Sequence, residues 1–582
     1  MGIFSGQTTA STALALSLWS AWGQDDDVSR WYVVGAFCKF WTLAVLVWCA
    51  WGMFIWPLAL SPLRGLPGPK ARNHWLMGQG KLVWKEPAGW PMLEWINSIP
   101  HEGIIRFRGF FNQENILICS PAAVCEVTVT HNDQFEKPSL IRGIAGRILG
   151  NGILLAEGDD HKMQRRKLMP AFSFRRIKEI YPVIWEKAAE DTQTLTSQIA
   201  GRDHIELETH GWFGRCALDI IGTVGLGRDF GAVEDQNNPL AKTYEEVMKP
   251  NRLARLFALL RLVFPDWLVN LLPTRRNNVI NDASHHIRGV CRDLVRDKKA
   301  RLAKGEQPDP DILSTALQGG GFTEDQVVDQ AMTFLAAGHE TVASTMTWAM
   351  YALCRNPEAQ SRLRQEVRER LPSVDSGKAV TSADIETMPY LGAVCNEILR
   401  LYPPVPLTVR QPLKDTTIQG LPVRKGTRIV LCPWATNRCH KYWGPAANEF
   451  HPERWLGSSD KAQRQEAGAE VVDDGDADIE GAGSARAAGG GGANLGGATS
   501  LYANLTFLHG PRSCIGQAFA RAEFACLLAT FIGRFEVELP DGCEGPRAEL
   551  EGEEGLGVQK GAFTAKPGRD GLVVKVRALG GF

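Results

Sequence analysis

One cysteine stands in an unusual loop near the C-terminus. The stretch TFLHGPRSCIGQAFARAEF, residues 506–524, places Cys514 among Gly, Pro and Arg, directly before an apolar segment that is typical of a helix. Backbone N–H groups, a helix N-terminus and nearby positive charge all stabilise a thiolate. Gly510 and Gly516 let the backbone fold closely around the sulfur, and Arg512 brings positive charge. The pattern therefore predicts a thiolate that binds a metal.

The other cysteines carry no comparable pattern. Thirteen cysteines are scattered along the 582 residues without a C-x-x-C pair, which argues against a disulfide framework or a zinc ribbon and favours a reducing compartment. Most of them, such as Cys125 and Cys395, are expected to be small buried hydrophobes. Because Lys plus Arg (64) nearly balances Asp plus Glu (65), we expect no nucleic-acid partner.

A second constraint lies near the N-terminus. Residues 40–60, FWTLAVLVWCAWGMFIWPLAL, contain no charge and are long enough to cross a bilayer as one helix. We interpret 1–39 as an N-terminal segment and 40–60 as a transmembrane anchor; the alternative is a buried core helix. Aspartates before the run and Arg and Lys after it favour a cytosolic C-terminal body.

The remaining chain is expected to form one large body. Residues 61–70 contain three prolines and predict a stiff linker. From 71 to 582 helical patterns dominate, with short runs such as GIIRFRGFF and ENILICS that are typical of hairpin strands, so the fold class is mainly α with a small β portion. Residues 457–500 have no aromatic side chain and include four consecutive glycines, which predicts a disordered insertion.

A long helix is predicted across the middle of this body. Thr323 and Gln326 form a capping box, and the helix should end at Asn356 before a proline. Inside it, AAGHET places Gly338 where alanine would be more favourable, so a flat ligand could lie against the backbone. Glu340 and the following Thr341 could relay protons through water; the alternative is a kinked core helix whose threonine bonds back to its own carbonyls.

Two further motifs place charges in apolar surroundings. Glu397 and Arg400 are three residues apart in NEILRLYPPVPL, so they share one face of a helix and are expected to be buried as a hydrogen-bonded pair. Taken alone, such a pair is more often solvated at the surface. The turn NEFHPERWL could bring Arg454 to the same buried carboxylate.

In this order and spacing, the motifs resemble those of the cytochrome P-450 superfamily, the haem-thiolate monooxygenases. FLHGPRSCIG, residues 507–516, matches F-x-x-G-x-R-x-C-x-G at every fixed position. AGHET resembles the oxygen-activating turn, Glu397 and Arg400 the E-x-x-R motif, and Arg454 the third member of a Glu-Arg-Arg cluster that supports the haem-ligand region. The resemblance covers about residues 66–577 without the insertion. It implies the P-450 fold, preceded by one transmembrane helix.

The resemblance also implies a cofactor and its ligands. The cofactor would be haem b, with Cys514 as the iron ligand and thiolate donation favouring O–O bond cleavage. DDHKMQRRKLMPAF resembles the family's W-x-x-x-R helix with histidine in place of tryptophan. The residues implied to contact the haem, beside the cysteine, are His161, Arg165, Arg410, Arg512, Phe507, Gly338, Ala337, Gly510 and Gly516.

By the same resemblance the chain is a monooxygenase similar to fungal members that act on terpenoids or polyketides. Glu340 and Thr341 would deliver protons to bound dioxygen, and an apolar substrate would receive one oxygen atom. The loop GLGRDFG lacks the spacing of a dinucleotide-binding loop. Electrons would therefore come from NADPH-cytochrome P-450 reductase, with cytochrome b5 as a further donor. The expected location is the endoplasmic reticulum membrane, single-pass, with a cytosolic catalytic domain.

Other functions remain open from the sequence. A haem-thiolate isomerase, dehydratase or peroxygenase would share the fold and need no reductase, and a fatty-acid hydroxylase would share the chemistry. A non-catalytic haem carrier or sensor in the membrane is a further alternative, although it would have little use for the acid and hydroxyl pair at Glu340 and Thr341.

Overall fold

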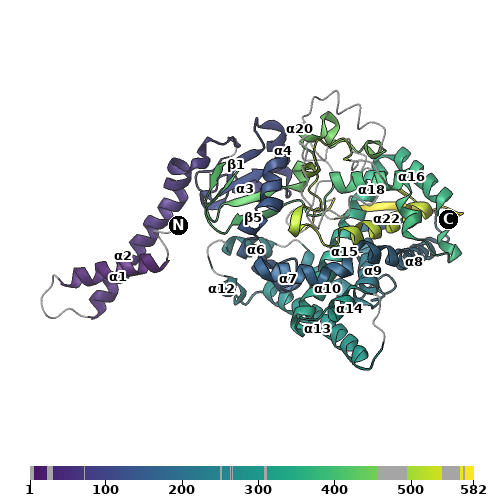
Figure 1. Cartoon of the computed structure of the whole chain (residues 1–582), viewed down its shortest axis with the longest axis horizontal. Helices are drawn as coiled ribbons and strands as arrows, with labels where there is room; N and C mark the ends of the chain where they lie inside the picture. Colours follow the sequence, from purple (N-terminus) through teal and green to yellow (C-terminus); the bar gives the residue numbers. More distant parts are fainter. Residues whose placement is uncertain are drawn as a thin grey trace.

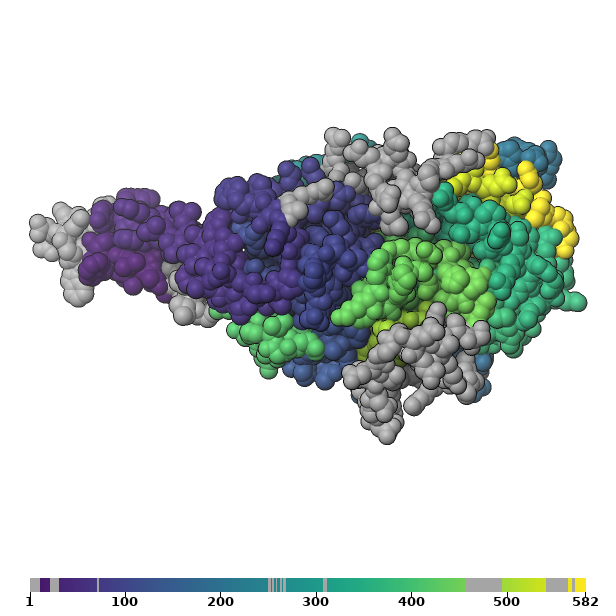
Figure 2. Space-filling model, turned by 90° about the horizontal axis from the view of Figure 1, so that it is seen from above, coloured from purple at the N-terminus to yellow at the C-terminus, as the bar shows by residue number. Residues whose placement is uncertain are grey.

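A helical body carries a small β region at one end, from which two N-terminal helices project (Figures 1 and 2). The computed structural model describes residues 6–22, 30–70, 73–249, 252–261, 264, 266–306, 311–456, 495–540, 564–567 and 571–582. The predicted fold class, mainly α with a small β portion, is confirmed.

Helices supply most of the described chain. The α-helices are α1 (Gly6–Trp22), α2 (Arg30–Ala50), α3 (Gly80–Lys85), α4 (Trp90–Ser98), α5 (Pro121–Cys125), α6 (Ser139–Leu149), α7 (Gly158–Leu168), α8 (Phe174–Ile199), α9 (Thr209–Ile220), α10 (Pro239–Met248), α11 (Arg252–Leu260), α12 (Asp266–Asn270), α13 (Arg275–Ala303), α14 (Ile312–Gln318), α15 (Glu324–Arg355), α16 (Pro357–Arg370), α17 (Ser382–Glu386), α18 (Pro389–Leu401), α19 (Pro433–Thr436), α20 (His440–Trp443) and α22 (Gln517–Arg534).

The described strands form three small sheets. They are β1 (Ile104–Arg108), β2 (Glu114–Ile118), β3 (Phe135–Glu136), β4 (Ile205–Glu208), β5 (Thr408–Pro412), β6 (Thr416–Ile418), β7 (Leu421–Val423), β8 (Arg428–Leu431), β9 (Phe535–Glu538) and β10 (Val573–Ala578). The largest sheet has the order β1-β2-β8-β5-β3, the second β4-β10-β9, and the third pairs β6 with β7. The predicted hairpin is confirmed, because β1 and β2 pair antiparallel with Ile105 opposite Leu117.

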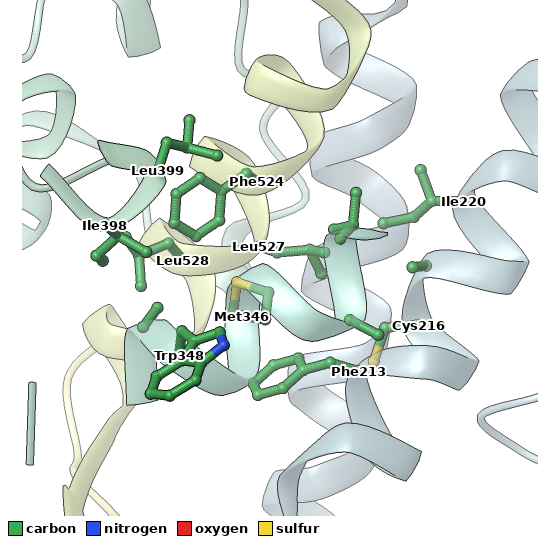
Figure 3. Close-up of a cluster of buried hydrophobic side chains, with 14 of the residues drawn as sticks. Phe213, Cys216, Ile220, Met346, Trp348, Ile398, Leu399, Phe524, Leu527 and Leu528 are labelled. Atoms are coloured by element: carbon green, nitrogen blue, oxygen red, sulfur yellow. The ribbon is translucent and has the colours of Figure 1, made fainter. Parts of the chain in front are cut away.

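The long helix α15 runs through the centre of the body. As predicted, its N-terminus has a capping box of Thr323 and Gln326, and Asn356 ends it before Pro357. Helices α9, α18 and α22 share a buried core with it (Figure 3). The core side chains that Figure 3 labels are Phe213, Cys216 and Ile220 of α9, Met346 and Trp348 of α15, Ile398 and Leu399 of α18, and Phe524, Leu527 and Leu528 of α22.

The N-terminal helices extend beyond the predicted anchor. The apolar helix covers the 30 residues Trp31–Leu60, where 40–60 was predicted, and an 18-residue window within it has a mean hydropathy of 2.0. Within the described residues it is the one helix long and apolar enough to cross a membrane. Its last ten residues, Trp51–Leu60, are wound as a π-helix. Inside the predicted segment 1–39, α1 lies beside α2 (Figure 1).

The C-terminal end of the anchor helix is bonded to the β region. The indole N–H of Trp56 donates to Glu114 Oε2 over 3.0 Å, and the Arg106 guanidinium donates to the carbonyl of Pro57. The guanidinium of Arg424 lies 3.5 Å from the centre of the Trp56 ring. Charged side chains of the body therefore contact the last turns of the helix directly.

Two predicted segment boundaries can be compared with the structure. The linker 61–70 begins with a 3₁₀ turn, Pro62–Gly65, and then runs along β1, because the carbonyl of Pro67 accepts the N–H of Arg106 over 2.8 Å. Of the predicted insertion, residues 457–494 lie outside the described residues. Its predicted end at Ser500 is too late, since Ala498 is buried and the N–H of Thr499 donates to the Tyr442 carbonyl.

Candidate active site

The loop that holds Cys514 is built by close backbone contacts. A 3₁₀ turn, Gly510–Arg512, precedes it, and the N–H of Cys514 donates to the carbonyl of Phe507 over 2.9 Å. Gly510 has a φ of +74°, and a Cβ there would lie 2.1 Å from the carbonyl oxygen of Thr128, so only glycine fits. The loop turns into α22 at Gln517, which points the helix N-terminus toward the sulfur.

The charge beside the sulfur differs from the prediction. Arg165 of α7, and not Arg512, is the cation next to Cys514: its guanidinium donates to the carbonyl of Ser513 over 2.7 Å. Burial raises the pKa of the Cys514 thiol, while the N–H of Gly516 and the charge of Arg165 lower it less than burial raises it. The loop alone therefore does not keep a thiolate, whereas a bound metal cation would deprotonate the thiol.

The middle of α15 borders interior space. Ala337, Gly338 and Thr341 retain accessible surface, although the residues before and after them on the helix are buried. The sulfur of Cys514 likewise has accessible surface while protein surrounds it. The Thr341 hydroxyl donates to the carbonyl of Ala337 over 2.8 Å, the local bond that the kinked-helix alternative expected.

Gly338 has a packing reason that the sequence did not reveal. A Cβ at this position would lie 2.8 Å from Cγ1 of Ile221, which belongs to the π-helix Ile221–Leu226 at the end of α9. The glycine thus allows α9 and α15 to approach each other. This contact explains why position 338 is glycine, and no flat ligand is needed to explain it. Contact between Gly338 and a cofactor stays a prediction.

Cations gather on the side of this space formed by α7, β5 and the cysteine loop. Arg410 is 4% exposed and donates only to Thr408 Oγ1 and the Val409 carbonyl; no described carboxylate pairs with it. Arg512 pairs with Glu157, which Lys137 also contacts through Nζ at 3.4 Å. Arg410 and Arg512 line one small pocket together.

The lowered pKa values in this cationic cluster reflect its excess of positive charge. The cluster consists of Lys137, His161, Arg165, Arg410 and Arg512. Burial, and then the neighbouring charges of Lys137, Arg165 and Arg410, lower the pKa of His161 to about 4. Burial and neighbouring arginines also hold the pKa of Lys137 well below its usual range. The described cations of this site outnumber its anions, and the two carboxylates of a haem would help to balance them.

Three predicted charges meet in a different place. Arg400 makes a two-pronged bond to Glu397, with Nε and Nη2 each 2.8 Å from a carboxylate oxygen, and both side chains have no exposed surface. Arg454 Nε donates to Glu397 Oε1 over 3.0 Å. The indole of Trp455 and the N–H of His451 also donate to this carboxylate. The structure thus brings the predicted paired cluster together inside the body.

The other predicted residues of the loop lie as follows. Phe507 packs against the core, with the guanidinium of Arg521 5.3 Å from the centre of its ring, and its carbonyl accepts the Cys514 N–H. Gly516 meets only the ring of Phe172, at 3.9 Å from a Cβ, so its use is its N–H rather than space.

Glu340 has partners that sequence reasoning missed. Its Oε1 accepts from Thr564 Oγ1 over 2.7 Å and lies 2.8 Å from Lys566 Nζ, and its Oε2 lies 3.4 Å from His210 Nε2. Burial would raise the pKa of Glu340, but His210 and Lys566 lower it far below its usual range. Lys137 and Glu157 were also missed; none of these residues sits in a recognisable motif.

Known proteins match the chain over most of its length. The family model described as cytochrome P-450 matches residues 69–565. The cytochrome P-450 monooxygenase sphH of Aspergillus fumigatus is 40% identical over 91% of this chain and 91% of its own. FUM15 of Gibberella moniliformis, named likewise, is 39% identical over 97% of this chain and 98% of its own, and buaD of Petromyces alliaceus 38% over 92% of each. The chain therefore belongs to the cytochrome P-450 family, whose members are haem-thiolate monooxygenases.

Proposed function

We propose that this monooxygenase inserts one atom of dioxygen into a C–H or C=C bond of an apolar secondary metabolite, a terpenoid or a polyketide. The fungal relatives support this choice, and so do the apolar side chains of Val405, Leu407 and Val409, which the resemblance to the family would place at the substrate. NADPH-cytochrome P-450 reductase would supply the electrons, with cytochrome b5 as a further donor. Fatty-acid hydroxylation is the alternative within the same chemistry.

The proposed cofactor is haem b, and the observation that carries it is the thiol of Cys514 beside a buried excess of cations. Cys514 would bind the iron, and Arg410, Arg512 and Lys137 would bind the propionates with His161 and Arg165. Haem in this setting supplies dioxygen binding and activation. The paired cluster of Glu397, Arg400 and Arg454 would fix the segments that lead to the cysteine loop.

The remaining steps belong to side chains of α15. Thr341 Oγ1 would release its bond to the Ala337 carbonyl and donate a proton into the interior space, and Glu340 would restore that proton. Because the neighbouring residues on α15 are buried, access of bulk water to Thr341 would be restricted, which would limit unproductive loss of protons.

We also propose that Trp31–Leu60 anchors the protein in the endoplasmic reticulum membrane with the catalytic body in the cytosol. The length of this helix, and the mean hydropathy of 2.0 of an 18-residue window within it, support an anchor. Arg64 and Lys70 follow the helix on the body side, which is the arrangement that the positive-inside rule associates with the cytosol.

The ligand assignment is tested with Cys514→Ser. We expect the variant to lose the red-shifted Soret band that the reduced carbon monoxide complex of a thiolate haem shows. The matched control is Cys125→Ser, which removes a partly buried thiol whose sulfur lies 3.2 Å from the Tyr502 hydroxyl, and should leave the spectrum unchanged. An unaltered spectrum in Cys514→Ser would refute the assignment.

The reaction class is tested by the source of oxygen. Product formed with NADPH, reductase and dioxygen supports a monooxygenase, whereas product formed with peroxide alone identifies a peroxygenase, and conversion without any oxidant an isomerase or dehydratase. Thr341→Ala should keep haem but divert reducing equivalents to peroxide, and full coupling in that variant would count against a proton relay.

A further inference from the structure

Glu340 and Thr341 are neighbours in sequence but serve different sides of α15. Thr341 borders the interior space, whereas Glu340 is 6% exposed and points to a C-terminal segment, residues 564–566. Successive residues of a helix are about 100° apart around its axis, so the two side chains cannot share one face. A proton relay through Glu340 and Thr341 therefore requires a group that controls the orientation of the Glu340 carboxylate.

The segment 564–566 is fixed to α15 along one stripe. The carbonyl of Ala565 accepts from the indole of Trp348 over 2.8 Å and from the Ser344 hydroxyl, and its N–H donates to the Pro404 carbonyl over 2.9 Å. Glu340, Ser344 and Trp348 are four residues apart, so they form one continuous face of the helix. These bonds to Ala565 place the backbone of the following residue, Lys566, beside this face, and its Nζ lies 2.8 Å from Glu340 Oε1.

Three groups form a chain of contacts at the end of this stripe. Lys566 Nζ lies 2.8 Å from Glu340 Oε1 and 2.7 Å from His210 Nε2, and His210 Nε2 lies 3.4 Å from Glu340 Oε2. An ammonium can only donate, so the contact between Lys566 and His210 requires a neutral imidazole that accepts through Nε2. A protonated imidazole must leave Lys566 and would instead donate to Glu340.

The imidazole is the most accessible member of the three. The side chain of His210 is 19% exposed, against 8% for Glu340 and 10% for Lys566. It stands at the first turn of α9, where Glu208 accepts the backbone N–H of His210 over 3.1 Å. Among the described residues, His339 on the same helix is a further titratable neighbour of Glu340, and it is buried. The Nδ1 of His210 is buried and has no hydrogen-bond partner among the described residues, so a proton that His210 takes up is bound at Nε2, beside Lys566 and Glu340.

We propose that His210 passes protons to Glu340 and that Lys566 is the positioning residue that holds the ionised carboxylate until a proton arrives. The N–H bond at His210 Nε2 breaks and an O–H bond forms at Glu340 Oε2, which returns the imidazole to its neutral form; no electrons are transferred. The neutral carboxyl loses its attraction to Lys566, turns toward Thr341 and gives up the proton there. This inference rests on the proposed oxygenase function for its purpose, but not for its geometry.

The first test needs no turnover. Infrared spectra of the ferric full-length enzyme are recorded against Glu340→Gln while the pH is lowered, so that the carboxyl band of Glu340 is isolated. In the wild type the band should remain that of an ionised carboxylate down to mild acid. In Lys566→Gln the pH of half-protonation should rise by about 1 to 3, because an opposite charge at contact distance shifts a carboxyl that much. Lys566→Arg should restore the wild-type titration.

The second test measures proton delivery. His210→Gln should lower the product formed per NADPH by about tenfold or more, raise the solvent deuterium isotope effect and change the pH profile, because the proton donor to Glu340 is lost. The control is His204→Gln, an exposed histidine nearby that pairs with Asp203. Lys566→Gln should shift the profile and Lys566→Arg should not.

Each result decides the inference separately from the proposed function. An unchanged infrared titration in Lys566→Gln, or an unchanged isotope effect and pH profile in His210→Gln, would overturn it. If the wild type forms no product with NADPH and dioxygen, the oxygenase proposal fails, and the infrared titration still decides whether Lys566 holds Glu340 ionised.

Discussion

Two buried groups of charges in this molecule are built in opposite ways. In the paired cluster, the carboxylate of Glu397 accepts from Arg400 and Arg454, and the remaining donors of Arg400 reach the carbonyls of Asn437, Ala447 and Glu449. In the cationic cluster, Arg410 has no described carboxylate partner, and Glu157 serves both Arg512 and Lys137.

This difference distinguishes buried charges that stabilise the fold from buried charges that are placed to bind a ligand. A buried charge whose hydrogen bonds are complete is part of the scaffold, and removing one partner leaves the others uncompensated. A buried excess of one sign destabilises the protein by itself and is relieved by a ligand of the opposite sign. We therefore expect the paired cluster to stabilise the fold and the cationic cluster to bind a ligand.

The largest expected effect is the loss of Arg400. Arg400→Met should destabilise the protein by about 3 to 5 kcal/mol, since it leaves Glu397 buried without its main partner. The measurement is thermal and urea unfolding together with the yield of haem-loaded protein. Arg362→Met is the control: it breaks an exposed ion pair with Glu453 and should change the unfolding free energy by at most about 1 kcal/mol.

The second-largest effect is expected at low pH, where His161 of the cationic cluster should lower the stability of the protein. The pKa of His161 is lowered to about 4 in the folded chain, so between about pH 6.5 and 4 the unfolded chain binds a proton that the folded chain does not. Stability of the haem-free chain should fall as the pH drops through this window, by about 3 kcal/mol in total. Urea unfolding at several pH values measures this slope. His161→Gln should lose it; a slope that persists would mean that another group carries it.

A smaller loss is expected at the edge of the paired cluster. Trp455→Phe removes the indole N–H that donates to Glu397 Oε2 over 2.9 Å and should cost about 1.5 to 3 kcal/mol, the usual range for a hydrogen bond to a charged group. Trp75→Phe, at an indole that is 68% exposed, serves as the control. Equal unfolding curves for the two variants would show that the carboxylate does not depend on this donor.

The smallest effect on unfolding is expected for Arg410→Met, and it sharpens the contrast with Arg400→Met. Replacing an unpaired buried cation by an apolar side chain of similar volume should change the stability of the haem-free chain by less than about 1 kcal/mol. The same variant should release haem several times faster, measured by transfer to apomyoglobin. Strong destabilisation with unchanged haem release would place Arg410 in the scaffold instead.

Local patterns in the sequence predicted the structural features that depend on residues close together in the chain. The hairpin of β1 and β2, both ends of α15, and the burial of Glu397 with Arg400 at a spacing of three residues all follow from periodicity and short motifs. The cysteine loop was also readable, because Gly510 is required by a close backbone approach within a recognisable motif.

Long-range contacts were not predictable from the same sequence. His210 and Lys566 reach Glu340 across 130 and 226 residues of chain, and neither lies in a motif. The reason for Gly338 is Ile221 on another helix, and the cation beside the sulfur is Arg165 rather than Arg512. The helix start at Trp31 was missed because Lys39 interrupts the apolar run, although an exposed lysine does not stop a helix.

If Trp31–Leu60 is the membrane anchor proposed above, the bonds from Trp56 and Pro57 to the β region would affect how the enzyme sits on a lipid surface. A helix longer than the hydrocarbon layer adjusts to bilayer thickness by tilting. Because the final turns of this helix are fastened to Glu114 and Arg106, any such tilt must rotate the entire catalytic body through the same angle. Lipid composition would thereby decide which part of the body meets the headgroups, and with it the path by which an apolar substrate leaves the bilayer.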